Sequence, residues 1–123
     1  MEALLCEQLA NALHFKYPGL IFHFDYGAGV HLTKNQAIKQ ARLNGRGYPD
    51  LNISAARGGK HGLYLELKAE GVRVWIKNGE LVADTHIREQ AAVLDRLRTE
   101  GYMAEFAIGF EMAMGIIHRY LAS

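Results

Sequence analysis

Apolar and polar residues alternate along two neighbouring stretches in the middle of the chain. Leu51 and Ile53 form the apolar set of the first stretch, and leucines occupy every second position of residues 63–67 in the next. Successive side chains of a strand point to opposite faces, so this period of two predicts two strands that each bury one face. The intervening glycine-rich segment 57–62 predicts a tight connection between them.

The rest of the chain shows helical and strand patterns in turn. Capping residues and apolar spacing predict helices over residues 2–17, 34–43, 84–100 and 110–121, and strands over 20–25 and 102–108. This order of elements predicts an α/β sandwich built around a mixed sheet with helices on its faces.

A hairpin is predicted between the central strands and the third helix. The apolar runs 72–77 and 80–82 flank Asn78-Gly79, the strongest short-range signal for a two-residue turn. Trp75 lies within it, and two roles are open: its ring covers the sheet, or it stacks on a nucleic-acid base.

Composition limits the number of domains and the cellular setting. With 123 residues, half of them hydrophobic, the chain can form one domain over residues 1–123, and a second does not fit. The start of the chain lacks a signal-peptide pattern and no apolar run reaches membrane-spanning length, so we expect a cytoplasmic protein. Cys6 is the only cysteine, which excludes a disulfide within the chain.

Charge is distributed unevenly although the net charge is only +1. Between residues 26 and 61 the only acid is Asp50, and six bases accompany it. This local excess of positive charge predicts contact with a phosphate backbone; a solvated basic helix and turn is the alternative. The bases are Lys34, Lys39, Arg42, Arg46, Arg57 and Lys60.

The polar positions of the central strands carry candidate chemistry. Pairing these strands brings Asp50 close to Glu66 and Lys68, which share one face of the second strand. Two carboxylates and the Leu67 carbonyl are oxygen ligands suited to Mg²⁺ or Mn²⁺, and a lysine beside the ion can hold or deprotonate the attacking water. The alternative is a solvated strand face with no chemistry.

Several ordered motifs resemble the VRR-NUC domain, the virus-type replication-repair branch of the PD-(D/E)xK nucleases. They cover nearly the whole chain and consist of residues 47–51, residues 61–68, Gln90, Gly101-Tyr102 and residues 109–113. The resemblance implies a restriction-endonuclease-like mixed sheet flanked by helices. It also implies that Asp50, Glu66 and Lys68 are catalytic.

Two further site residues follow from the same resemblance. The family's first helix supplies a glutamate; we expect Glu2, whose helical stripe continues inward through Cys6 and Leu9, rather than Glu7. Gln90 matches a glutamine that would orient water or phosphate. Three residues before this glutamine the family usually has a small hydroxyl residue, and this chain has Ile87 there. An exposed polar role for Gln90 therefore stays open.

The resemblance implies a Mg²⁺- or Mn²⁺-dependent, structure-specific DNA endonuclease in a bacterial or phage-infected cell. We expect a four-way (Holliday) junction as the DNA partner and a homodimer as the active assembly, because resolution needs two cuts related by a two-fold axis. The alternatives are a DNA-binding module with a structural acidic cluster, and an interaction domain that binds no nucleic acid.

Overall fold

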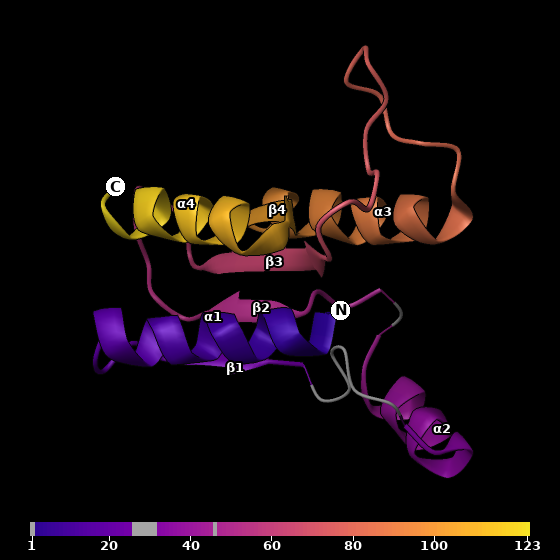
Figure 1. Ribbon diagram of the computed structural model, residues 1–123, viewed down its shortest axis with the longest axis horizontal. Coiled ribbons are helices and arrows are strands. Elements are labelled where there is room, and N and C mark those ends of the chain that lie inside the picture. Colours follow the sequence, from indigo (N-terminus) through magenta and orange to yellow (C-terminus); the bar gives the residue numbers. More distant parts are fainter. Residues whose placement is uncertain (1, 26–31, 46) are drawn as a thin grey trace.

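A mixed sheet of four strands forms the middle layer of the molecule (Figure 1). The computed structural model describes residues 2–25, 32–45 and 47–123, without the side chain of Glu2. The elements in chain order are α1 (Glu2–Lys16), β1 (Phe22–Phe24), α2 (Lys34–Leu43), β2 (Leu51–Ile53), β3 (Leu63–Lys68), α3 (Thr85–Thr99), β4 (Met103–Ile108) and α4 (Gly109–Leu121). The predicted α/β class and order of elements are confirmed.

The strand order is β1-β2-β3-β4, and the pairs β1–β2 and β2–β3 are antiparallel. β3 and β4 are parallel, so the chain must cross over between them, and α3 lies within this crossover. The registers that matter most for the site are Leu51 opposite Leu65 and Glu66 opposite Phe106. They place the end of β3 beside the start of β2.

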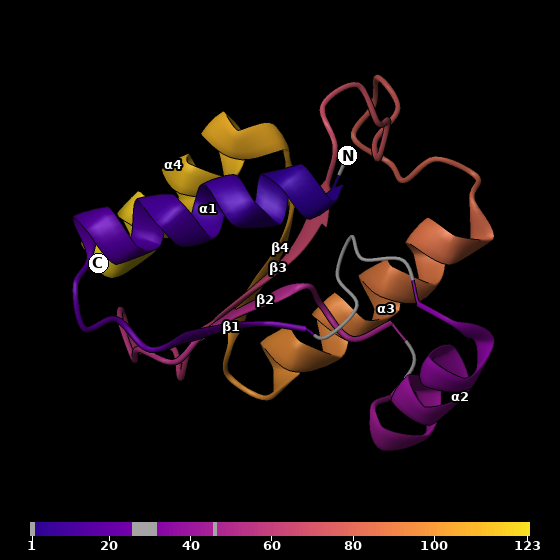
Figure 2. The ribbon, with the colours of Figure 1, turned by 60° about the horizontal axis from the view of Figure 1, so that its bottom comes forward.

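The two faces of the sheet are covered by different helices (Figure 2). Leucines of β2 and β3 pack with Leu9, Leu13 and Ile117, which lie on α1 and α4 and are fully buried. On the other face, Ala104 and Phe106 of β4 pack under α3 with Leu94. Because strand side chains alternate, Glu66 and Lys68 share the face opposite to the leucines, as predicted, and this is the face that α3 covers.

Helix α2 stands apart from the three-layer body (Figures 1 and 2). Thr33 caps it in a complete capping box with Gln36, and Asn44 ends it, which confirms the predicted bounds. None of its residues is buried, and Ile38 and Leu43 are exposed. Capping therefore stabilises this helix more than tertiary packing does.

The predicted hairpin forms only as a short turn within a projecting loop between β3 and α3 (Figure 1). One isolated bridge joins Trp75 to Leu81, and the Gly79 N–H donates to the Ile76 carbonyl at 2.9 Å. Val74 alone in this loop is buried, and a two-stranded hairpin with so little apolar contact is marginal. The prediction of two flanking strands was therefore wrong.

Trp75 and β1 also differ from expectation. The indole packs edge-on against Phe106 with 6.1 Å between ring centroids, yet remains 39% exposed, so it only partly covers the sheet. β1 contains Phe22–Phe24 rather than the six predicted residues, since only these three residues pair in register with β2. Every helix within the described part of the chain is too short or too polar to span a bilayer.

Candidate active site

Asp50 is joined to β3 through the main chain of Leu67. The β2–β3 register places Leu51 opposite Leu65, so two residues further along Pro49 falls opposite Leu67. Proline has no N–H and cannot continue the ladder of hydrogen bonds. The Asp50 carboxylate instead accepts the Leu67 N–H, with 2.8 Å between Oδ2 and N. The Pro-Asp pair therefore ends the ladder and holds an acid at its end.

The Leu67 carbonyl faces the same side of the strand. The N–H and C=O of a strand residue point in one direction, and the Leu67 N–H points at Asp50. Pro49, opposite, has no hydrogen to donate to this carbonyl. The oxygen is thus directed toward the Asp50 carboxylate, where the sequence predicts a metal ligand.

Glu66 is a buried carboxylate with two cationic or polar neighbours. Its side chain is 5% exposed, the Gln90 amide donates to its Oε2 at 3.0 Å, and the Lys68 ammonium lies 4.0 Å from the same oxygen. Lys68 is itself only 13% exposed. Burying a charge is unfavourable unless it is paired and hydrogen-bonded, and these two contacts supply such partners to the Glu66 carboxylate. The structure therefore brings Glu66, Lys68 and Gln90 together.

Gln90 reaches this cluster from α3, the helix over that face of the sheet. It is 7% exposed, which excludes the open alternative of an exposed helix residue. Asp84 caps α3 through the Ile87 N–H at 2.9 Å, and this cap sets the turn that points Gln90 inward. His86, one turn earlier, places its Nε2 3.3 Å from the same amide nitrogen. No role is predicted for His86 from the sequence, although it lies four residues before Gln90 and therefore on the same side of the helix.

Asp25 is a second neighbour that the sequence analysis missed. Its N–H donates to the Asp50 carbonyl at 2.8 Å, directly after β1, and Gln40 of α2 lies within 3.5 Å of its carboxylate. Burial is the largest cause of a raised pKa at Asp25; the nearby Asp50 charge also raises it, while Gln40 and His23 act in the opposite direction. An acid ending the strand that pairs with β2 was the available signal.

The first helix carries two glutamates, Glu2 and Glu7, that are candidates for the metal-site carboxylate. Glu2 opens α1, and its side chain lies outside the described residues. Glu7 is exposed, as expected for a surface charge. Within the described residues, no three His, Cys, Asp or Glu side chains form a group able to hold a metal ion. Asp50, Glu66 and the Leu67 carbonyl would therefore need further ligands to bind a metal ion.

The predicted DNA-binding residues separate into two groups, and Arg46 lies outside the described residues. Lys34, Lys39 and Arg42 belong to α2, which contacts the Asp50 end of the sheet through the Gln40–Asp25 pair. Arg57 and Lys60 lie in the connection beyond the other end of β2. The structure does not bring these two groups together into one basic surface around Asp50.

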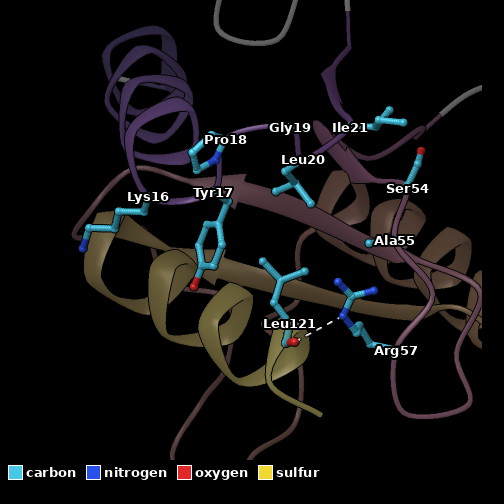
Figure 3. Close-up of a pocket in the computed structure, with 10 residues that line it drawn as sticks. All are labelled: Lys16, Tyr17, Pro18, Gly19, Leu20, Ile21, Ser54, Ala55, Arg57 and Leu121. Carbon is cyan, nitrogen blue, oxygen red and sulfur yellow. Dashed lines mark hydrogen bonds between the residues drawn. The ribbon is translucent and has the colours of Figure 1, made fainter.

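Arg57 borders a cavity of about 530 Å³ at that far end (Figure 3). Its guanidinium donates to the Leu121 carbonyl at 3.2 Å, and Tyr17 hydrogen-bonds His118 of α4 nearby. These contacts join the ends of α1, α4 and β2. The cavity contains none of the predicted catalytic residues, so it is separate from the candidate active site.

Comparison with known proteins relates the whole chain to one domain type. No family model matches this sequence, and none of the curated proteins matches it. A solved structure described as "VRR_NUC domain protein" is similar to it, with a TM-score of 0.67 and 25% sequence identity; the match covers 98% of this chain and 88% of the other. Together with the motifs around Asp50 and Glu66, this match supports a VRR-NUC domain, a nuclease-type domain, and the chain has the restriction-endonuclease-like α/β fold.

Proposed function

We propose that this chain is a metal-dependent endonuclease that hydrolyses phosphodiester bonds of branched DNA. The observation that carries the proposal is the cluster at the end of β3. Asp50 accepts the Leu67 N–H, and Glu66 lies beside Lys68 and Gln90. Two carboxylates and a carbonyl that can bind a metal ion, next to an amine that can bind water, suit hydrolysis of a phosphodiester.

The chemistry of the donors fits Mg²⁺ or Mn²⁺. Asp50, Glu66 and the Leu67 carbonyl would supply hard oxygen ligands, and Glu2 would add a carboxylate from α1. When bound, such an ion polarises the phosphate and lowers the pKa of a bound water. The absence of a histidine or cysteine from this set disfavours zinc.

The chain's own residues would divide the remaining work. The Lys68 ammonium, 4.0 Å from Glu66, would hold or deprotonate the attacking water and offset charge on the phosphate. Gln90 would hold Glu66 in place through its amide nitrogen. The bases of α2 would contact the DNA backbone and orient it toward Asp50.

A homodimer would allow two cuts in one four-way junction. Each chain offers one candidate site, and the strands cut in a junction are related by an approximate two-fold axis. The loop 72–82 is our proposed interface, because Val72, Trp75 and Ile76 expose apolar surface on it. Such an enzyme would act in the cytoplasm of a bacterial or phage-infected cell.

One experiment separates this proposal from its alternatives. The protein is incubated with duplex, flap, splayed and four-way junction DNA, with Mg²⁺, with Mn²⁺ and with chelator. We expect cleavage of the junction that requires the ion and is lost in Lys68→Ala. DNA binding without cleavage in any condition would favour a binding module in which Asp50 only closes the strand ladder. Absence of binding would favour an interaction domain.

A further inference from the structure

The orientation of the Gln90 amide is determined by two acceptors. An amide nitrogen carries two hydrogens, and a carboxylate can only accept, so one hydrogen is directed to Glu66 Oε2 at 3.0 Å. The other faces His86 Nε2 at 3.3 Å. An amide nitrogen only donates, so His86 Nε2 is the acceptor of this second bond. The reverse amide orientation would place two acceptor oxygens against each other at Glu66.

The Gln90 amide oxygen needs a hydrogen-bond donor that the described residues do not supply. Gln90 is 7% exposed, and its Oε1 has no hydrogen-bond partner among the described residues. Buried polar atoms in folded proteins nearly always have a partner, supplied by protein or by water. Because an amide oxygen has no hydrogen, the partner must be a donor. Phosphodiester oxygens only accept, which excludes direct contact between this oxygen and the DNA phosphate.

We propose that His86 is a positioning residue that fixes the Gln90 amide so that its oxygen accepts a hydrogen bond from the water of the hydrolysis. This inference rests on the proposed nuclease function. The Lys68 ammonium and the Gln90 amide nitrogen both approach the same oxygen of Glu66, so a water bound at this cluster would be close to the ammonium, the carboxylate and the amide. With the amide turned over, the water would lose its acceptor and Glu66 its donor.

A purely structural role for His86 is poorly supported by its surroundings. The side chain is exposed, and the N-terminus of α3 is already capped by Asp84 through the Ile87 N–H. Replacing His86 therefore removes little packing and leaves the cap in place. The contact with the Gln90 amide nitrogen is the interaction that distinguishes His86 from an ordinary exposed histidine.

The test compares wild type with His86→Ala, His86→Gln and His14→Ala. Glutamine can place an acceptor oxygen near the position of Nε2, and His14 is a matched exposed histidine in α1 whose ring packs on Phe22. We measure kcat and KM on four-way junction DNA with Mg²⁺. Separately, NMR records the Gln90 side-chain amide resonances and their hydrogen exchange, with Gln90→Ala identifying the signals.

We expect His86→Ala to lower kcat about 10- to 100-fold with little change in KM, the usual range for residues that orient a catalytic ligand. Exchange of the Gln90 amide hydrogens should accelerate in the same variant. His86→Gln should restore both properties, and His14→Ala should match wild type. A wild-type kcat for His86→Ala, or unchanged Gln90 resonances, would overturn the proposal. If wild type cuts no DNA, the nuclease proposal fails, and the NMR result alone supports or overturns the positioning role.

Discussion

The Asp50 carboxylate accepts the main-chain N–H of Leu67 at 2.8 Å, at the position where Pro49 interrupts the β2–β3 ladder. One side chain thus completes the sheet and presents negative charge at its end. A carboxylate oxygen that accepts one N–H still has lone pairs for a cation. Structural and chemical roles of Asp50 are therefore separable by substitution.

Asp50→Asn should abolish cleavage while leaving the fold intact, whereas Asp50→Ala should also lower stability. Asparagine keeps an acceptor for the Leu67 N–H but removes the charge that attracts a cation. Alanine leaves the N–H without this acceptor, which lowers the free energy of unfolding by about 1–3 kcal/mol. Denaturant unfolding and junction cleavage measure the two effects. Full cleavage by Asp50→Asn would contradict the assignment.

Glu2→Gln should weaken Mn²⁺ affinity at least about tenfold, and Glu7→Gln should change it little. Glu2 opens α1 on the stripe that continues through Cys6 to buried Leu9, whereas Glu7 is exposed. Calorimetric titration with Mn²⁺ in the absence of DNA compares the two variants directly. The reverse ranking would assign the helix carboxylate to Glu7.

Replacing Lys34, Lys39 and Arg42 by alanine should flatten the salt dependence of DNA affinity. Each lost phosphate contact lowers the slope of log affinity against log salt by about 0.9 on duplex DNA. The matched control is Arg57→Ala with Lys60→Ala, at the other end of β2. Fluorescence anisotropy over a salt series measures both slopes. A larger loss in the control would place the DNA at the far end of the sheet.

Ile76→Glu should convert a dimer into a monomer that nicks one strand of a junction. Ile76 is 43% exposed on loop 72–82, so a charge there opposes apolar association without disturbing the core. Phe15→Glu is the control, since Phe15 is 85% exposed on α1. Sedimentation at micromolar concentration measures the assembly. A wild-type monomer, alone and on a junction, would exclude the dimer and the paired cuts.

Tyr64→Phe should remove a loss of stability at alkaline pH. Burial, with a smaller contribution from the hydrogen bond with Tyr48, raises the pKa of Tyr64 to about 12. Below the unfolded value of about 10, both states hold the proton and this stabilisation is complete; it is lost as pH rises toward the folded pKa. Solvent screening limits the effect to about 1 kcal/mol. Unfolding from pH 9 to pH 12, with tyrosinate absorbance, measures it; Tyr102→Phe is the control.

The local pattern of the sequence determined most helices and strands of this protein and the part of its site that lies on β2 and β3. Alternating leucines determine which face of β3 is buried, and therefore that Glu66 and Lys68 share the opposite face. Pro49 and Asp50 similarly specify where the ladder ends, because proline lacks the N–H that pairing needs. These features depend on backbone geometry within a few residues, which a sequence displays directly.

Tertiary structure decided which contacts complete the cluster, and it added His86 and Asp25, for which the sequence predicted no role. Gln90 reaches Glu66, and His86 reaches Gln90, because α3 packs over β4 beside β3, and Asp25 reaches Asp50 because β1 pairs with β2. Such contacts depend on helix placement and strand order, and no periodicity in the sequence encodes the distance between elements.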